Sequence, residues 1–387
     1  MARLKAIVFL SIVFIGASDT LAQSEASELR IFGYFQNSFI HQTGFKTEFD
    51  QEAENNSFAV QQLNLFFQKD LARNWRAFVN FEFLNNFSSS RQWGDANLEE
   101  AWVRFRANEK FNLKLGLLIP IFNNLNEIKN RTPLLPYVIR PIVYETSFQE
   151  FIAVEEYLPA RAFVQAYGFI PIHELKFDYA FYLGNSPNIN NRSDIGQTGV
   201  DSTDTFLIGG RIGARFGELK IGLSGTRENV NGFPSVEAVT GNPPVYFNEV
   251  PRTRLGGDLS YHLEKFSFEA EFIIVTYDDD MPEVCIDKTF YYGTLGYQVT
   301  EQLFVYASYW VTEEEFTQEL DFLDAPVVVS GKSDIKVPTI GVSYNLNDRV
   351  TLKGQFAPVD IEPEIPSLQL RQEIEFNHYS IAASVFF

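Results

Sequence analysis

The sequence predicts an all-β protein in which about sixteen antiparallel strands close into a barrel that crosses a membrane. Three observations support this fold class. Apolar and polar residues alternate at period two in stretch after stretch, and short and long polar links alternate between these stretches. No apolar run of about 18 residues, the length of a spanning helix, follows the N-terminal segment, so a helical membrane bundle is excluded.

Residues 75–84 illustrate the alternation. Trp75, Ala77, Val79, Phe81 and Phe83 fall on one face, and Arg76, Phe78, Asn80, Glu82 and Leu84 fall on the other. Successive side chains of a strand point to opposite faces, so one side of this strand is apolar and the other is mostly polar. The same pattern recurs at residues 176–184, 206–216, 218–226, 265–277 and 349–357.

The links between the strands come in two lengths that alternate along the chain. Short links lie at 69–74, 107–110, 171–173, 217, 264, 299–302 and 345–348, and long links lie around 41–56, 87–96, 120–159, 185–203, 228–251, 278–286, 313–333 and 358–373. The strands between them have about 9–13 residues, close to the length of a tilted membrane strand. Membrane barrels place short turns at the periplasmic end and long loops outside, whereas a soluble sandwich has no reason to separate them.

The N-terminal residues 1–22 are predicted to be a secretory signal peptide, which leaves residues 23–387 as the barrel domain. Arg3 and Lys5 form the positive region, residues 6–17 form a short apolar run, and residues 20–22 provide a small-residue cleavage site. The alternative interpretation of this segment is a first buried strand or helix.

The composition excludes several classes of protein. The 387 residues include 31 Lys and Arg against 50 Asp and Glu, a formal net charge of −19 that argues against a nucleic-acid partner. Cys285 is the only cysteine, so the fold is not stabilised by intramolecular disulfides and needs another source of stability, such as a closed inter-strand ladder. The 38 Phe and 17 Tyr suit a lipid-facing belt with interfacial aromatic girdles.

The second face of the strands is predicted to line the inside of the barrel. A soluble sandwich could not bury so many charges without a steep desolvation cost, whereas a water-filled lumen removes that cost. Basic and acidic residues on different strands would set up a transverse field, unless they pair locally. The basic set is Arg76, Arg104, Arg106, Lys114, Lys176, Arg211, Arg215, Lys220, Arg254 and Lys353; the acidic set is Glu82, Glu100, Asp178, Asp258, Glu269 and Glu271.

The third long link, about residues 120–159, is the longest and has its own apolar content. A loop of this kind should fold onto something, and the lumen is available, so we expect part of it to fold inward and narrow the pore. A solvated external loop is the alternative. Its candidate constriction charges are Glu127, Lys129, Arg131, Arg140 and Glu145.

Short sequence motifs along nearly the whole mature chain carry a family resemblance. They are LNLFF at 63–67, NWR at 74–76, LEEAWV at 98–103, LKLG at 113–116, VQAYG at 164–168, YAFYLGN at 179–185 and LGGDL at 255–259. In these motifs the chain resembles outer-membrane porins of the phosphate-selective porin O/P type and their relatives. Its last strand, which ends in Phe387, resembles the C-terminal signature of bacterial outer-membrane barrels in general. The resemblance implies a sixteen-stranded homotrimer whose third loop folds into the lumen and whose lysines and arginines select anions. This chain departs from that pattern in its acidic balance and in the mixed charges of its third loop.

The sequence therefore predicts an outer-membrane porin for passive diffusion of small hydrophilic solutes or ions, with anions such as phosphate as one class. Its expected partners are outer-membrane lipid and lipopolysaccharide. No cofactor or metal site is expected, because His41, His173, His262 and His378 lack the spacing of metal ligands. The alternatives are a barrel hydrolase, for which Ser260 and His262, two residues apart on one face of a strand, are the candidate pair, and a plugged structural or adhesive barrel.

Overall fold

The computed structural model describes residues 28–46, 52–84, 95–129, 131–145, 158, 160–186, 203, 205–230, 250–278, 284–322, 325–366 and 370–387. The predicted signal peptide, residues 1–22, lies outside the described residues. Its cleavage therefore remains a prediction, and so does the domain boundary that depends on it.

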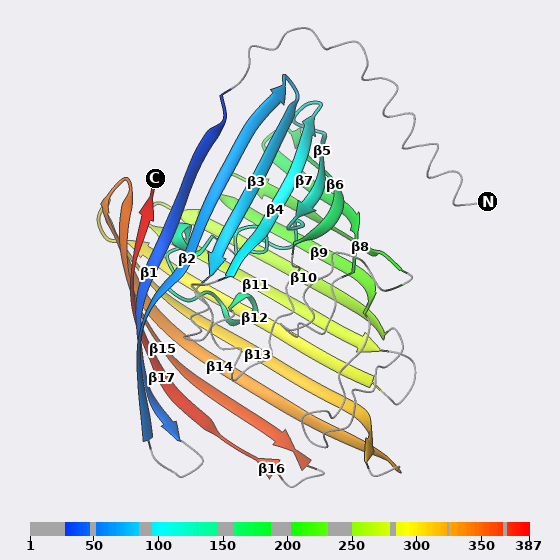
Figure 1. Cartoon of the computed structure of the whole chain (residues 1–387), viewed down its shortest axis with the longest axis vertical. Helices are drawn as coiled ribbons and strands as arrows, with labels where there is room; N and C mark the ends of the chain where they lie inside the picture. Colours follow the sequence, from blue (N-terminus) through cyan, green and yellow to red (C-terminus); the bar gives the residue numbers. More distant parts are fainter. Residues whose placement is uncertain are drawn as a thin grey trace, which may run out of the picture.

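Seventeen strands form one antiparallel sheet, and all but the two-residue β16 are long (Figure 1). They are β1 (Arg30–Lys46), β2 (Glu52–Ala72), β3 (Trp75–Leu84), β4 (Asp95–Arg106), β5 (Asn112–Leu118), β6 (Arg161–Ile172), β7 (Leu175–Gly184), β8 (Leu207–Phe216), β9 (Leu219–Val230), β10 (Val250–Leu263), β11 (Phe266–Asp278), β12 (Val284–Gln298), β13 (Leu303–Phe322), β14 (Ala325–Asn347), β15 (Val350–Ile365), β16 (Leu370–Arg371) and β17 (Ile374–Phe386). Two short 3-10 turns, η1 (Thr132–Leu134) and η2 (Ile142–Tyr144), lie in the third loop.

The sheet closes on itself. Each long strand pairs with the next one along the chain, and β1 pairs with both β2 and β17. At this seam the backbone N–H of Gly33 donates to the Phe387 carbonyl at 2.9 Å, and the N–H of Phe387 returns a bond to the Gly33 carbonyl at 3.0 Å. Closure leaves no unpaired strand edge, which is what a sheet inside lipid requires. The predicted closed barrel of sixteen strands is confirmed.

The two ends of the barrel differ as the link lengths predict. Short connections such as 173–174, 217–218 and 264–265 lie at one end, called here the turn end, and longer connections lie at the other, the loop end. One predicted long link is wrong. The hairpin of β13 and β14 continues in register through residues 313–333 to the pair Phe322 and Ala325. Outside the membrane, strand pairing needs no apolar face, so Glu313 to Glu315 do not end the strand.

The outward face of the barrel is apolar and exposed. Phe181, Ile212, Leu223, Ile340 and Ile381 are each 58–60% exposed, and they alternate along their strands with less exposed, inward-facing residues. Exposed apolar side chains in a continuous belt are the signature of a surface that faces lipid. Among the helical turns of the described residues, none is long and apolar enough to cross a membrane.

The inner wall is not polar throughout, and here the sequence prediction needs correction. Toward the loop end, β11 to β15 turn buried apolar side chains inward, among them Ile273, Val275, Trp310, Val337 and Val359. They form one cluster with residues of the third loop such as Phe122, Leu125, Ile139 and Tyr144. The loop therefore packs on an apolar wall inside the barrel, and burial of each large side chain stabilises this arrangement by about 1.5–3 kcal/mol.

The lipid-facing belt makes a first prediction. Leu223 is an exposed outward residue near the middle of β9, so Leu223→Arg should lower the free energy of unfolding in lipid vesicles by about 2–4 kcal/mol. Leu223→Ala is the matched control and should cost much less. Denaturant unfolding in vesicles measures both. Equal stability of the arginine variant and the wild type would contradict a lipid-facing position for β9.

Candidate functional site

The third loop, between β5 and β6, lies inside the barrel, as predicted. Its first segment crosses to β9, β10 and β11: the backbone N–H of Asn123 donates to Ser224 Oγ at 2.9 Å, and Asn123 Nδ2 donates to the Phe272 carbonyl at 3.2 Å. The backbone N–H groups of Asn124 and Leu125 both donate to Glu271 Oε1 at 2.8 Å. These contacts fasten the start of the loop to the far wall.

Gly256 on β10 makes this approach possible. A Cβ atom built at Gly256 would lie 2.4 Å from Asn123 Oδ1 and 2.8 Å from the Phe122 ring. Any other residue would therefore push the loop away from the wall. The close passage of the loop explains the first glycine of the LGGDL motif, whereas a Cβ at the second, Gly257, would meet the Phe272 ring of β11.

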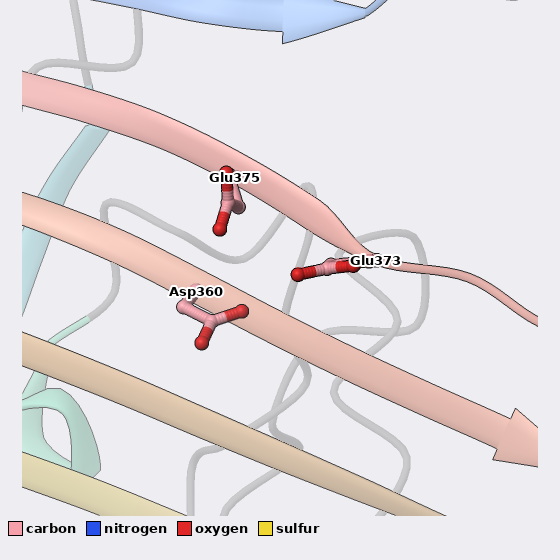
Figure 2. Close-up of side chains that lie close together, drawn as sticks. All are labelled: Asp360, Glu373 and Glu375. Atoms are coloured by element: carbon pink, nitrogen blue, oxygen red, sulfur yellow. The ribbon is translucent and has the colours of Figure 1, made fainter.

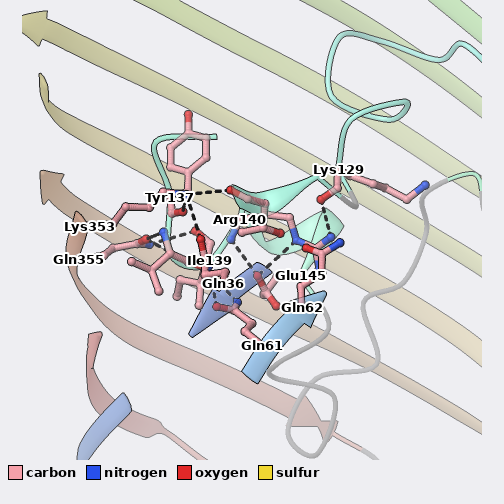
Figure 3. Close-up of polar contacts among 12 residues, drawn as sticks. Gln36, Gln61, Gln62, Lys129, Tyr137, Ile139, Arg140, Glu145, Lys353 and Gln355 are labelled. Carbon is pink, nitrogen blue, oxygen red and sulfur yellow. Dashed lines mark hydrogen bonds and ion pairs between the residues drawn. The ribbon is translucent and has the colours of Figure 1, made fainter. Parts of the chain in front are cut away.

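The middle of the loop is held by β15, β1 and β2 (Figure 3). Lys353 Nζ donates to the carbonyls of Thr132, Pro133 and Tyr137 at 2.9, 3.2 and 3.3 Å. Gln355 Oε1 accepts the backbone N–H groups of Val138 and Ile139, at 2.7 and 3.0 Å, and its Nε2 donates to the Ile139 carbonyl at 3.1 Å.

Two further side chains of the wall complete the attachment of the middle segment. Gln61 Nε2 donates to the Val138 carbonyl at 3.0 Å, and the Tyr137 hydroxyl donates to Thr294 Oγ1 at 2.9 Å. The loop thus touches strands on several sides of the lumen. The backbone groups of a buried loop need such partners, because water cannot reach them there.

Three of the predicted constriction charges hold the loop together instead of facing the pore. Lys129, Arg140 and Glu145 are 1%, 8% and 2% exposed. Lys129 Nζ donates to the Leu158 carbonyl at 2.8 Å, and Arg140 Nη1 donates to the Lys129 carbonyl at 2.6 Å. The backbone N–H of Arg140 donates to Glu145 Oε2 at 2.8 Å, so the two loop charges also pair with each other.

The other two, Glu127 and Arg131, remain about one-third exposed and face β4 and β5. Arg131 Nη2 lies 3.3 Å from Glu100 Oε1, and Lys114 Nζ lies 3.5 Å from Glu127 Oε1. Lys114 also lies over the rings of Trp102 and Tyr167, with 5.0 and 5.5 Å to the centroids. This side of the loop therefore brings charges of both signs together at the narrow section.

Several predicted wall charges are buried in ion pairs. Arg211 lies between Asp178 and Asp258, with 2.7 Å from Nη2 to the Asp258 carboxylate. Arg254 pairs with Glu228, which also binds Arg252, a pair that the sequence prediction missed. These groups are inward-facing, but their charges are compensated within the wall.

The remaining predicted charges are placed as follows. Two arginines form ion pairs: Arg76 with Asp70 at 2.6 Å and Arg215 with Asp178 at 3.3 Å. Three residues form hydrogen bonds with uncharged partners: Lys220 with Asn124 of the loop, Glu82 with Gln62, and Glu269 with Tyr292. Arg106 is exposed at the turn end, and Arg104 makes no side-chain hydrogen bond or ion pair within the described part of the chain.

The strand register groups the bases into two rows. Arg76, Arg104 and Lys114 lie opposite one another on β3, β4 and β5, and Lys176, Arg215 and Lys220 do so on β7, β8 and β9. Cross-strand neighbours on one face have Cβ atoms about 4.5–5.5 Å apart, so each row concentrates positive charge on the inner wall. The sequence predicted that these six basic residues face inward, but not that they align across neighbouring strands.

Figure 2 shows one cluster outside the lumen, formed by Asp360, Glu373 and Glu375 at the loop end of β15 and β17. Their carboxylate oxygens lie within 4.8 Å of one another. Lys336 lies opposite Asp360 in the β14–β15 register, so a cation of the chain itself is close to the cluster. We assign no metal to this cluster.

More than half of the chain matches a known protein family. Residues 164–362 match the model of a family described as Gram-negative porin. The chain belongs to the Gram-negative porin family. As a porin of this family it is an outer-membrane channel protein. The predicted porin family is therefore confirmed at this wider level, and the O/P type remains a prediction. No curated protein sequence matches the chain.

Solved structures of outer-membrane proteins share its fold at low identity. The loop L8 deletion mutant of OmpT from Vibrio cholerae is 11% identical, covers 94% of this chain and 100% of its own, and has a TM-score of 0.58. The anion-selective porin from Comamonas acidovorans is 14% identical, with coverage of 93% and 100% and a TM-score of 0.58. The DcaP channel of Acinetobacter baumannii is 9% identical, with coverage of 95% and 99% and a TM-score of 0.57.

The fit of the loop against β10 can be tested by one matched pair of variants. Gly256→Ala should displace the first loop segment, because overpacking costs about 1–3 kcal/mol, and trypsin should then cleave faster at Lys129 and Arg131. Gly293→Ala is the control, because a Cβ there meets nothing within 4 Å. Limited proteolysis of the folded barrel reports both. Equal cleavage rates in the two variants would contradict the close contact.

Proposed function

We propose that this porin forms a narrow, water-filled channel for passive diffusion of small hydrophilic solutes or ions. The observation that carries the proposal is the fastening of the third loop across the lumen at β11 and β15, with Glu127 and Arg131 left partly exposed on it. A barrel of about sixteen strands is too wide for wall side chains to fill. The loop would then set the size limit, and the exposed charges beside it would set the ionic preference.

A mild preference for anions is part of the proposal, with phosphate as one member of that class. The two in-register rows of bases support it, because Lys176 and Arg215 are exposed and Arg104 forms no direct ion pair within the described residues. The mixed pairs at Glu127 and Arg131 weaken the field at the narrow section, so we expect selectivity to be modest. Closer kinship with phosphate-selective porins stays a prediction.

The remaining parts of the proposal concern the environment of the barrel. Removal of residues 1–22 would release the chain for outer-membrane insertion, where it would contact lipid and lipopolysaccharide. A homotrimer is proposed by analogy, because OmpT of Vibrio cholerae, 11% identical with a TM-score of 0.55, is described in a trimer form.

A plugged barrel is the second candidate, because the described loop contacts strands on several sides of the lumen. A barrel hydrolase has less support: Ser260 and His262 face the lumen two residues apart, and no hydrogen bond joins them among the described residues. Purified protein in a planar bilayer, together with a lipase assay, separates the candidates. Stepwise conductance supports the channel, a silent membrane with lipase activity supports the hydrolase, and silence with no such activity supports the plug.

The proposed ionic preference predicts the direction of a charge change. Arg104→Gln, and separately Arg131→Gln, should move the reversal potential in a salt gradient toward cations, since each removes a positive charge beside the narrow section. Lys336→Gln is the matched control, because this lysine lies on the outward face and should leave the potential unchanged. Absence of a shift in both arginine variants would remove these residues from the selectivity filter.

A further inference from the structure

Glu271 binds two separate segments of the third loop with one carboxyl group. Its Oε1 accepts the two backbone N–H groups of Asn124 and Leu125, near the start of the loop, and its Oε2 accepts the hydroxyl of Tyr144, in η2, at 2.7 Å. Glu271 is only 4% exposed. Three loop hydrogen bonds converge on this one buried side chain, so its removal would leave buried donors of the loop without their partner.

Lys353 holds a third segment of the loop, residues 132–137, by hydrogen bonds. Its ammonium group, on a residue 4% exposed, donates to three loop carbonyls and to Gln36 Oε1 at 3.0 Å. The carbonyls of Thr132 and Pro133 belong to η1, and that of Tyr137 lies three residues after it. β15 lies four strands from β11 in the closed sheet, so the two attachment points are well separated around the lumen.

Neither group has an opposite charge as its hydrogen-bond partner. Glu271 is satisfied by N–H and O–H donors, and Lys353 by carbonyl and amide oxygens, so polar groups that belong mostly to the loop satisfy both side chains. Both groups are also enclosed by the loop they hold. By contrast, Arg131 and Glu127 remain partly exposed beside the narrow section.

We propose that Glu271 and Lys353 are positioning residues that together set the free cross-section of the pore, and that neither contributes to its charge selectivity. The inference rests on the proposed channel function. Each residue would hold a different part of the loop against a different wall, so loss of either one should widen the narrow section independently. The exposed groups beside the narrow section, Glu127 and Arg131, should still determine the charge preference in these variants.

The test uses single-channel recordings of the full-length, refolded protein in planar bilayers with potassium chloride. Glu271→Leu and Lys353→Met remove the hydrogen-bonding groups at similar volume. Each is expected to raise conductance about twofold, because the narrowest section limits ion flow, and the double variant should exceed both. Glu271→Gln keeps an acceptor oxygen for the two loop N–H groups, so it should restore conductance most of the way to the wild-type value, with an unchanged reversal potential.

Glu314→Leu and Lys288→Met are the matched controls, since these inward-facing residues form an ion pair with each other at 3.4 Å between β13 and β12. Both should keep the wild-type conductance. Heat-modifiable mobility on gels verifies that every variant is folded, and Glu271→Gln keeps the test decisive if Glu271→Leu does not fold. A wild-type-like conductance in folded Glu271→Leu and Lys353→Met would overturn the positioning roles. A reversal potential shifted by Glu271→Gln would overturn the claim that its charge is not sensed.

These outcomes are distinct from failure of the channel proposal. A wild-type protein that never conducts would overturn the proposed function itself. A wild-type protein that conducts in steps, with variants that leave the step size unchanged, would overturn only the positioning inference.

Discussion

Pairing of every strand edge is the constraint on which the other features of this molecule depend. In lipid, unpaired N–H and C=O groups cost several kcal/mol each, so the sheet must close, and β17 meets β1 to close it. Sixteen long strands then enclose a lumen too wide for wall side chains to fill. The third loop occupies this space, and its own backbone groups must be paired in turn. The polar residues of the inner wall serve that purpose as much as they serve solutes.

This requirement changes how the charges of the lumen are interpreted. A charged side chain on the inner wall can face water, pair within the wall or bind the loop. Arg211 and Arg254 pair with wall carboxylates, and Lys353 and Glu271 bind the loop. The net charge of −19 therefore says little about the ionic preference of the pore, because only the exposed, uncompensated groups act on a passing ion.

The sequence predicted the barrel well because strand alternation is a local property. The assignment of Trp75 to Leu84 as a strand needed no knowledge of any other segment, and the structure confirms it as β3. Alternation failed where both faces of a strand carry similar residues. Trp310 is buried inside the barrel between Tyr309 and Val311, which are also largely apolar, so the pattern could not reveal an apolar inner wall.

The roles of the site residues could not be predicted in the same way. Lys353 was expected to face inward, but the groups it binds lie more than 200 positions earlier in the chain. That contact depends on which strands stand near the loop after closure, which no local pattern encodes. The glycine at position 256 gave a usable signal, because a glycine pair inside a strand often marks a close backbone approach.

Polymer exclusion by the wild-type protein measures whether the third loop narrows the lumen. Neutral polymers of graded size are added to both sides of a bilayer that contains single channels, and conductance is recorded for each size. Polymers that enter the pore lower its conductance, and those that are excluded do not. A loop held across the lumen predicts that only the smallest polymers reduce the current. Entry of polymers as wide as an empty barrel of sixteen strands would show that the loop does not narrow the channel.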